Sequence, residues 1–254
     1  MREMPGVGLV VGAASGMGQA VARRLASEGV HVVVSDLAED GCEATVEGIR
    51  AAGGAASADP VDATDVEALR ELMGRIEAAH GGLDFLHAHV GMPGPAGLEI
   101  SEADWQKNVD VNMKSAFFAC AYAMPLLRRS KAGSIVLTAS TSAIVGSASS
   151  PLYSMTKGSL TSFARALAVH GANDGVRANV ICPGPVETPM LPTFFSREDG
   201  ADIGALMART LAKVPLGRVA APEEVAGVVA FLASSDASYV TGVTIPIDGG
   251  RTAA

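Results

Sequence analysis

The sequence predicts a single α/β domain, residues 1–254, in which helices cover both faces of a doubly wound parallel sheet. Three observations lead to this prediction. The chain has 254 residues, 48% of them hydrophobic and 18% charged, so it can bury one large core. Short runs of β-branched residues alternate with longer stretches whose apolar residues recur at helical spacing. No internal repeat, low-complexity block or linker-like run divides the chain into two domains.

The predicted strands are short apolar runs of the kind that a parallel sheet buries on both faces. In chain order they are Val7 to Val11, Val30 to Val34, Phe85 to Val90, Ile135 to Thr138, Val176 to Cys182, and Val243 to Ile247. The predicted helices are Gly18 to Glu28, Glu39 to Ala52, Val66 to His80, Asp104 to Arg129, Tyr153 to His170, and Pro222 to Ser234. Strand, helix and strand in succession imply parallel crossovers, and hence three α/β/α layers.

Composition and charge exclude several classes of function. The net charge of −8, from 27 acidic and 19 basic residues, gives a surface that repels phosphate backbones and anionic lipid, so we expect neither nucleic acid nor membrane as a partner. The sequence contains no run of about 18 uninterrupted apolar residues, so it predicts no transmembrane helix. The three cysteines, Cys42, Cys120 and Cys182, are far apart and form no C-x-x-C motif. With no signal-peptide pattern at the N-terminus, these features favour the reducing cytoplasm.

A glycine-rich turn follows the first predicted strand. It is Gly12-Ala13-Ala14-Ser15-Gly16-Met17-Gly18, and a predicted helix starts within it. Glycines there let the backbone approach a pyrophosphate at a helix N-terminus, where free N–H groups and the helix dipole favour an anion. The alternative is a tight strand-to-helix turn with no ligand.

Asp36 follows the second predicted strand, 18 residues after Gly18. An acid about 20 residues beyond such a turn can hold the hydroxyls of an adenosine ribose. The alternative is that Asp36 caps the following helix. A carboxylate here repels a 2′-phosphate, and Ser15, Leu37 and Ala38 supply no cation to hold one, so the sequence favours NAD over NADP.

Tyr153 and Lys157 lie four residues apart, which places them on one face of a predicted helix. A cation beside a phenol stabilises the phenolate and lets the tyrosine act as an acid or base closer to neutral pH. Ser140 follows a predicted strand, at the sheet edge where open α/β sheets bind ligands. The alternative for Tyr153 and Lys157 is an ordinary surface pair.

With these residues in place, the sequence resembles the short-chain dehydrogenase/reductase family over essentially its whole length, and so a Rossmann-like fold. The motifs that carry the resemblance are Gly12-x-x-x-Gly16-x-Gly18, Asp36, Asp62, Asn112 in Asn108-Val109-Asp110-Val111-Asn112, Ser140, Tyr153-x-x-x-Lys157, Asn179-x-x-x-Pro183-Gly184 with Thr188, and Tyr239-Val240-Thr241-Gly242 with Asp248-Gly249-Gly250.

The resemblance implies a role for each matching residue. Tyr153 exchanges the proton, Ser140 hydrogen-bonds the substrate oxygen, Lys157 lowers the pKa of Tyr153 and holds the nicotinamide ribose, and Asn112 anchors a water in the proton relay. Asp62 meets the adenine amine, and Val186 and Thr188 meet the carboxamide. The full set expected to hold NAD is Gly12, Ser15, Gly16, Met17, Gly18, Asp36, Asp62, Gly91, Tyr153, Lys157, Pro183, Gly184, Val186 and Thr188.

Two positions depart from the family pattern. Val11 stands where the family has a threonine before the first glycine, and Ala88-His89-Val90-Gly91 replaces the usual Asn-Asn-Ala-Gly. His87 and His89 share one strand face, but no third ligand is evident, so we expect packing or hydrogen bonding and no metal. Cys182 reads as a small core residue, and Trp105 as core or interface packing.

The segment from Pro183 to Gly217 is irregular and lies where family members carry a substrate loop. Its bulky apolar side chains predict a mainly apolar pocket: Met190, Leu191, Phe194, Phe195, Leu206 and Met207. We expect the charged Arg197, Glu198 and Asp199 at its solvent edge. The alternative is that the two phenylalanines are buried in a subunit interface.

These features predict a cytoplasmic, NAD-dependent oxidoreductase that moves a hydride between the cofactor and a secondary alcohol or ketone, with an apolar or cyclic substrate. One alternative is a 3-oxoacyl carrier-protein reductase, which typically prefers NADP and needs a basic surface. Another is a non-catalytic cofactor-sensing protein, which would be expected to lack an intact set of Tyr, Lys and Ser. The resemblance also implies a homo-oligomer, a tetramer or dimer formed through the long helices and the C-terminal segment.

Overall fold

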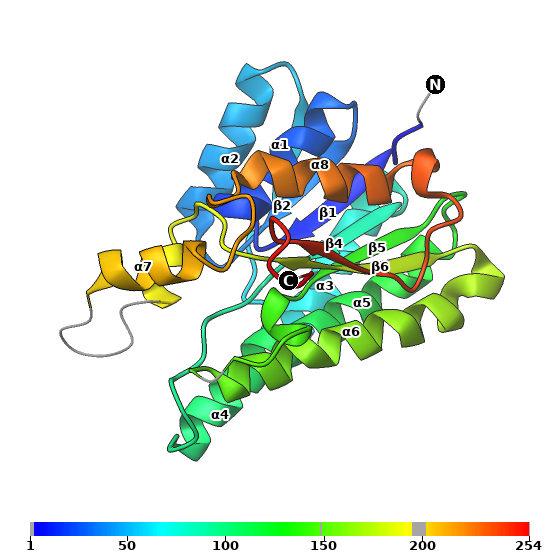
Figure 1. Cartoon of the computed structure of the whole chain (residues 1–254). Coiled ribbons are helices and arrows are strands. Elements are labelled where there is room, and N and C mark those ends of the chain that lie inside the picture. Colours follow the sequence, from blue (N-terminus) through cyan, green and yellow to red (C-terminus); the bar gives the residue numbers. More distant parts are fainter. Residues whose placement is uncertain (1–2, 148, 195–201, 254) are drawn as a thin grey trace.

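One parallel sheet of seven strands, in the order β3-β2-β1-β4-β5-β6-β7, forms the centre of the structure. The computed structural model describes residues 3–147, 149–194 and 202–253, and Figure 1 shows the whole chain. The strands are β1 (Val7–Val11), β2 (His31–Ser35), β3 (Ala55–Ala58), β4 (Phe85–Ala88), β5 (Ser134–Thr138), β6 (Arg177–Pro183) and β7 (Thr244–Ile247). The chain starts in the middle of the sheet, adds β2 and β3 on one side, and then crosses back to β4. Ligands of such sheets bind at this reversal, beyond the carboxyl ends of β1 and β4.

Helices cover both faces of the sheet, which confirms the predicted three layers. They are α1 (Gly16–Ser27), α2 (Glu39–Ala51), α3 (Val66–His80), α4 (Glu102–Val109), α5 (Ser115–Leu127), α6 (Pro151–Gly171), α7 (Ile203–Leu211) and α8 (Pro222–Ala233). The helices α1, α2 and α8 pack on one face, and α3, α5 and α6 pack on the other. None of the helices among the described residues combines the length and apolar character needed to cross a bilayer.

The two faces of the sheet contribute to separate hydrophobic cores. Neighbouring residues on a strand point to opposite faces, so Leu9 belongs to the core under α3, α5 and α6, while Val10 belongs to the core under α1 and α8. The same alternation holds at Val33 and Val34 on β2. Burial on both faces explains why these strands are apolar at nearly every position.

The structure differs from the sequence prediction in three elements. Strand β3 was not predicted, because Ala55–Ala58 contains only alanine and serine and lies at the edge of the sheet. Helix α7 lies inside the segment that was expected to be irregular. The predicted helix from Asp104 to Arg129 instead consists of α4, a π turn over Asp110–Lys114 and α5. The other predicted elements are present, with ends that differ by at most two residues.

Candidate active site

A cleft of about 360 Å³ lies at the carboxyl ends of the strands, over the reversal between β1 and β4. The segments that follow β1, β2, β3 and β4 form its walls together with the end of β5 and the start of α6. Of the predicted site residues, it brings together Gly12, Ser15, Gly16, Met17, Asp36, Asp62, Gly91, Tyr153, Lys157 and Thr188. The others, Gly18, Asn112, Ser140, Pro183, Gly184 and Val186, do not line it.

The glycine turn has a shape that side chains would obstruct. Gly12 and Gly16 have φ values of +95° and +56°, in the left-handed region that favours glycine. A Cβ at Gly18 would lie 1.9 Å from the carbonyl oxygen of Gly12, so the first turn of α1 packs directly on the backbone before it. The hydroxyl of Ser15 makes no capping hydrogen bond to α1, and no acidic residue occupies the first turn. The first turn of α1 therefore offers free backbone N–H groups and the positive end of the helix dipole, and both fit the diphosphate of a dinucleotide.

Asp36 links the second strand to the glycine turn. Its Oδ2 accepts a hydrogen bond from the backbone N–H of Ala14 (3.2 Å), and its Oδ1 accepts one from Ala38 (3.1 Å). No side chain caps the start of α2, so the capping alternative for Asp36 does not apply. The carboxylate therefore lies in the cleft in a fixed orientation, where it fits the two hydroxyls of an adenosine ribose. Asp62 also lines the cleft, and its Oδ1 accepts hydrogen bonds from the N–H and hydroxyl of Thr64.

Lys157 is a buried cation, with 3% of the residue exposed. Its Nζ donates hydrogen bonds to the carbonyl oxygens of Thr138 (3.0 Å) and Val90 (3.4 Å), at the ends of two neighbouring strands. Burial lowers the pKa of Lys157 from its ordinary 10.5 to about 8. A Cβ at Gly91 would lie 2.6 Å from Nζ, so this position must be glycine for the ammonium to keep its place.

Tyr153 enters the cleft one helical turn before Lys157, on the same face of α6. The residue is 7% exposed, and the ring of Phe194 meets its ring edge-on with centroids 5.4 Å apart. Ser140 follows β5 by two residues, and its Oγ accepts a hydrogen bond from the N–H of Ser142 (3.1 Å). An aromatic side chain from the predicted substrate loop therefore contacts the predicted proton donor.

Asn112 is fully buried in the π turn between α4 and α5. Its Oδ1 accepts from the N–H of Met92 (2.8 Å), and its Nδ2 donates to the carbonyl of Met92 and to the Oγ1 of Thr156. The side chain thus ties the segment after β4 to helix α6. It positions the neighbourhood of the cleft without lining it.

The segment after β6 passes over the glycine turn. The N–H of Gly184 donates to the carbonyl of Ile247 (2.9 Å), and Val186 pairs with Ala220 in a parallel bridge. Thr188 then reaches the cleft, and a Cβ added at Gly16 would lie 3.2 Å from the Cβ of Thr188. Phe195, Arg197, Glu198 and Asp199 lie outside the described residues.

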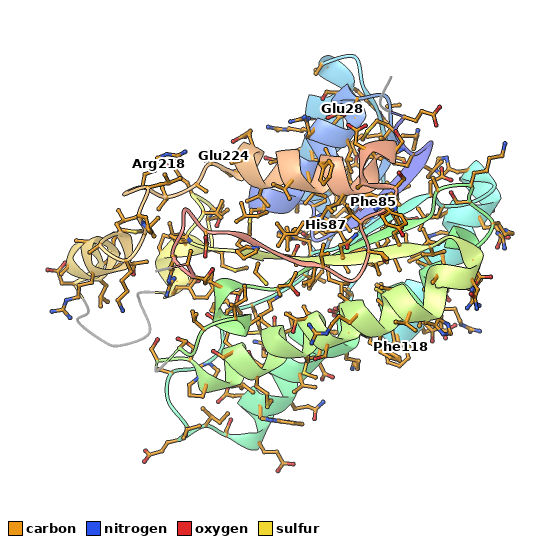
Figure 2. All side chains as sticks on the ribbon, turned by 45° about the vertical axis from the view of Figure 1, so that its right-hand side comes forward. Glu28, Phe85, His87, Phe118, Arg218 and Glu224 are labelled. Atoms are coloured by element: carbon orange, nitrogen blue, oxygen red, sulfur yellow. The ribbon has the colours of Figure 1, made fainter. Side chains whose placement is uncertain are left out.

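His87 and His89 both form hydrogen bonds with Thr138. Both rings reach the hydroxyl of Thr138, His87 through Nε2 (2.8 Å) and His89 through Nδ1 (3.0 Å). Figure 2 shows His87 in the interior of the sheet. Within the described part of the chain, no cluster of three or more His, Cys, Asp or Glu could hold a metal ion. All three cysteines are buried and unpaired.

Sequence reasoning missed several residues of the cleft. Thr138 and His89 line it, although neither had been assigned to the site, whereas Met190, which also lines it, had been predicted for the substrate pocket. The signal for the two missed residues is position, because Thr138 ends β5, His89 directly follows β4, and strand ends meet at the ligand edge of the sheet.

The chain is similar to known proteins over almost its whole length. The family model described as Enoyl-(Acyl carrier protein) reductase matches residues 12–252. The chain is 37% identical to a cis-4-hydroxycyclohexanecarboxylate dehydrogenase from Sinomonas cyclohexanicum, over 97% of this chain and 96% of that protein. It is 36% identical to a meso-2,3-butanediol dehydrogenase from Serratia marcescens, over 96% and 94%.

Solved structures show the same architecture. The crystal structure of levodione reductase superposes with a TM-score of 0.93 at 29% sequence identity, covering 98% of both chains. The superposition covers nearly all of both chains, so the sheet and the helix layers have counterparts in that protein.

We predict that acid destabilises the fold through the two buried histidines. Burial lowers the pKa of His87 well below 6.5, and burial together with the Lys157 cation lowers that of His89 to about 3. Below about pH 6.5 the unfolded chain therefore binds protons that the folded chain excludes, and the free energy of unfolding falls by about 1.4 kcal/mol per pH unit for each histidine. Urea denaturation from about pH 6.5 down to about pH 4.5 measures this slope.

In the variant His89→Asn, the fall in the free energy of unfolding per pH unit should be smaller by the contribution of one histidine. In the control Leu98→Ala, which changes an exposed side chain that does not titrate, the slope should stay as it is. Equal slopes in all three proteins would contradict the prediction.

Proposed function

This chain belongs to the short-chain dehydrogenase/reductase family, and we propose that it is an NAD-dependent enzyme that interconverts a secondary alcohol and its ketone. The observation that carries the proposal is the pairing of Tyr153 with the buried ammonium of Lys157 on one face of α6, inside a cleft whose other end fits a dinucleotide. Bound NAD supplies the hydride chemistry.

The residues of the chain supply position and proton transfer. In alcohol oxidation, the Oη of Tyr153 accepts the hydroxyl proton of the substrate, and in ketone reduction it returns that proton. The ammonium of Lys157 stabilises the phenolate, because a cation in a dry site favours the charged form of a neighbouring acid. The Oγ of Ser140 donates a hydrogen bond to the substrate oxygen. Asn112 holds the segment after β4 against α6, which keeps these groups in register.

Two observations support NAD over NADP. The carboxylate of Asp36 is held at the cleft by two backbone N–H groups and repels a 2′-phosphate. Among the described residues that line the cleft, Lys157 is the one lysine or arginine, and its Nζ donates to the carbonyl oxygens of Thr138 and Val90 at the opposite end.

The substrate is proposed to be apolar, and a cyclic alcohol fits best. Phe194 packs on Tyr153, and Met190 lines the cleft beside it, so the reacting carbon faces an apolar wall. One curated relative acts, by its name, on a cyclohexane ring that carries a hydroxyl and a carboxylate, and the ring of that substrate agrees with this wall.

Two alternatives make different predictions. A 3-oxoacyl carrier-protein reductase would turn over acyl thioesters, and it requires basic surface for an acidic carrier, which a net charge of −8 disfavours. A cofactor-sensing protein without turnover needs no proton donor, whereas Tyr153, Lys157 and Ser140 are all retained. Assays of secondary alcohols, sugars, steroids and acyl thioesters with NAD and NADP, following the absorbance of the reduced nicotinamide, separate the three.

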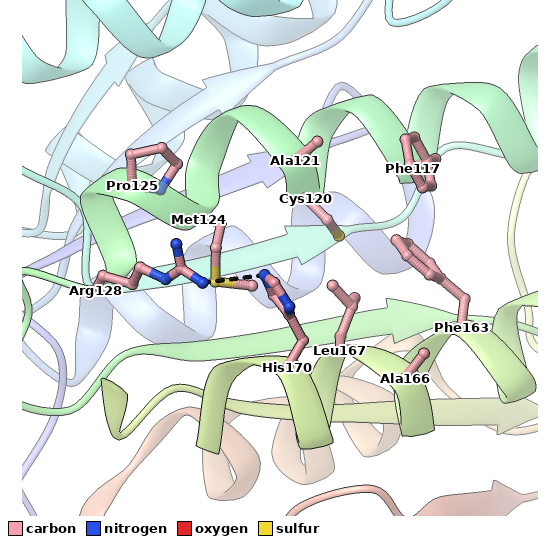
Figure 3. Close-up of a pocket in the computed structure, with 10 residues that line it drawn as sticks. All are labelled: Phe117, Cys120, Ala121, Met124, Pro125, Arg128, Phe163, Ala166, Leu167 and His170. Atoms are coloured by element: carbon pink, nitrogen blue, oxygen red, sulfur yellow. Dashed lines mark hydrogen bonds between the residues drawn. The ribbon is translucent and has the colours of Figure 1, made fainter. Parts of the chain in front are cut away.

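We also propose that the enzyme is a cytoplasmic homo-oligomer that associates through α5 and α6. These helices enclose an apolar groove of about 520 Å³, shown in Figure 3. Phe117 is 49% exposed there and stacks on Phe163 at 5.3 Å, while Arg128 and His170 are hydrogen-bonded to each other at the other end. A second copy of the chain is the proposed occupant, because a charged fraction of only 18% leaves extensive apolar surface to cover.

Free, buried cysteines agree with a reducing compartment.

We predict that the unmodified enzyme has a much larger kcat/KM with NAD than with NADP. The variant Asp36→Ala should narrow that ratio by about tenfold or more, because it removes the repulsion of the 2′-phosphate. Asp40→Ala makes the same charge change at an exposed position on α2 outside the cleft and should leave the ratio unchanged. Equal use of the two cofactors by the unmodified enzyme would rule out the assignment.

We predict that Tyr153→Phe lowers kcat by about 10²–10⁴-fold with little change in NAD affinity, because it removes the proton donor and spares the dinucleotide site. Lys157→Ala should impair both. The control is Tyr239→Phe, which removes a hydroxyl from a fully exposed ring. Steady-state kinetics and calorimetric titration with NAD measure the two effects. More than a tenth of the activity remaining in Tyr153→Phe would point to a different acid.

We predict that cyclic or aryl-alkyl alcohols outperform polyols of similar size and that Phe194→Ala raises KM for them by about tenfold, because it removes the apolar wall. Phe231→Ala removes an exposed ring on α8, outside the cleft, and should not alter kinetics. NAD plus substrate should also protect the segment 183–217 from proteolysis. If NAD plus substrate does not protect this segment from proteolysis, and KM and kcat are unchanged in Phe194→Ala, the segment is not a lid and the substrate class is open again.

We predict that Phe117→Glu dissociates the oligomer, because it places a charge in the apolar groove between α5 and α6. Ile203→Glu makes a similar change at an exposed position on α7 and should leave the assembly intact. Sedimentation velocity measures both. If the unmodified protein is a monomer, this interface does not exist. If the oligomer survives Phe117→Glu, the interface lies elsewhere.

A further inference from the structure

Two imidazoles and one hydroxyl form a row of hydrogen bonds beneath the cleft. The Nε2 of His87 lies 2.8 Å from the Oγ1 of Thr138, and the Nδ1 of His89 lies 3.0 Å from the same oxygen. His87 is fully buried, Thr138 is 4% exposed, and His89 lines the cleft. The row therefore runs from the interior of the sheet to the ligand edge, across the ends of β4 and β5.

A hydroxyl has a single proton, and this determines how the row is arranged. If Thr138 donates to one imidazole, it must accept from the other. The Nδ1 of His87 is buried and has no hydrogen-bond partner among the described residues. A buried, unpaired N–H is rarer in proteins than an unpaired acceptor, so this Nδ1 is best left without a proton. His87 then carries its proton on Nε2 and donates it to Thr138, and Thr138 donates to the Nδ1 of His89.

This arrangement leaves the proton of His89 on Nε2, the nitrogen that makes no hydrogen bond within the described part of the chain. The ring edge that carries Nε2 faces the glycine turn. A Cβ at Gly18 would lie 3.0 Å from the Cδ2 of His89, the carbon bonded to Nε2. An N–H donor is thus held between the turn that fits the diphosphate and the carbonyls that hold Lys157.

We propose that His89 is a cofactor-binding residue that donates its Nε2–H to an oxygen of the dinucleotide, and that Thr138 and His87 are positioning residues that select its tautomer. The inference rests on the proposed function and assigns to its dinucleotide site a donor at a position where this chain departs from the family pattern. The usual Asn-Asn-Ala-Gly has a side-chain amide at this position, and in this chain the relay gives an imidazole the same donor ability. The low pKa values of both rings agree with this, because only neutral imidazoles can have a defined tautomer.

The tautomer can be measured without cofactor. In protein labelled with ¹³C and ¹⁵N at its 5 histidines, the Cδ2 and ring-nitrogen shifts distinguish the two tautomers at pH 7.5, and His89→Asn assigns the resonance. We expect the Nε2–H form for His89 in the unmodified protein. Thr138→Val should convert that signal to a mixture of both forms, because the hydroxyl that selects the tautomer is gone. A predominant Nδ1–H form of His89 in the unmodified protein would overturn the inference.

Calorimetric titration with NAD tests the contact itself. His89→Leu removes the donor and should weaken binding about tenfold, whereas His89→Asn restores an N–H and should bind within about threefold of the unmodified protein. Ser134→Ala removes a buried hydroxyl from the opposite end of β5, outside the cleft, and should not change the affinity. If Thr138→Val does not fold, the comparison of NAD affinity between His89→Leu and His89→Asn still tests the inference.

Unchanged affinity in His89→Leu would overturn the inference while leaving the proposed function intact. Failure of the unmodified protein to bind NAD at all would overturn both, so the two failures are distinguishable.

Discussion

A single ammonium group, the Nζ of Lys157, constrains the ligand edge of the sheet. Because it is buried, it needs polar partners, and it finds them in the carbonyl oxygens that end β4 and β5. Its position forbids a side chain at Gly91 and fixes the end of β4 relative to α6. The ends of β4 and β5, the start of α6 and this wall of the cleft therefore meet around one buried charge.

Helix α6 connects the chemistry of the cleft to the outer surface. Its first turns carry Tyr153 and Lys157, and its later turns carry Phe163 and His170 in the groove that it forms with α5. Thr156 joins this helix to the buried amide of Asn112, so α5 and α6 are held together between the two sites. Association of two chains at the groove would therefore support the helix that positions the proton donor, although the groove and the cleft share no residue.

Periodicity predicted six of the seven strands and both helix layers, and the resemblance to the family supplied most of the cleft residues that match its motifs. Strand β3 escaped because alanine and serine leave no apolar pattern, and only pairing with β2 gives Ala55–Ala58 its conformation. The hydrogen bonds of Asp36 could not be predicted, since they depend on how the glycine turn folds back over β2. The same holds for His89, whose partner Thr138 is 49 residues away and becomes a neighbour only when β4 and β5 pair.

The π turn over Asp110–Lys114 gives the long segment between β4 and β5 an additional property. One extra residue in a helical turn advances every later side chain by about 100° around the axis. The rows of side chains on α4 and α5 are consequently out of phase. The face that α4 presents and the face with which α5 lines the outer groove can therefore change independently in sequence, while Asn112 at the phase shift keeps the turn between them attached to α6 through Thr156.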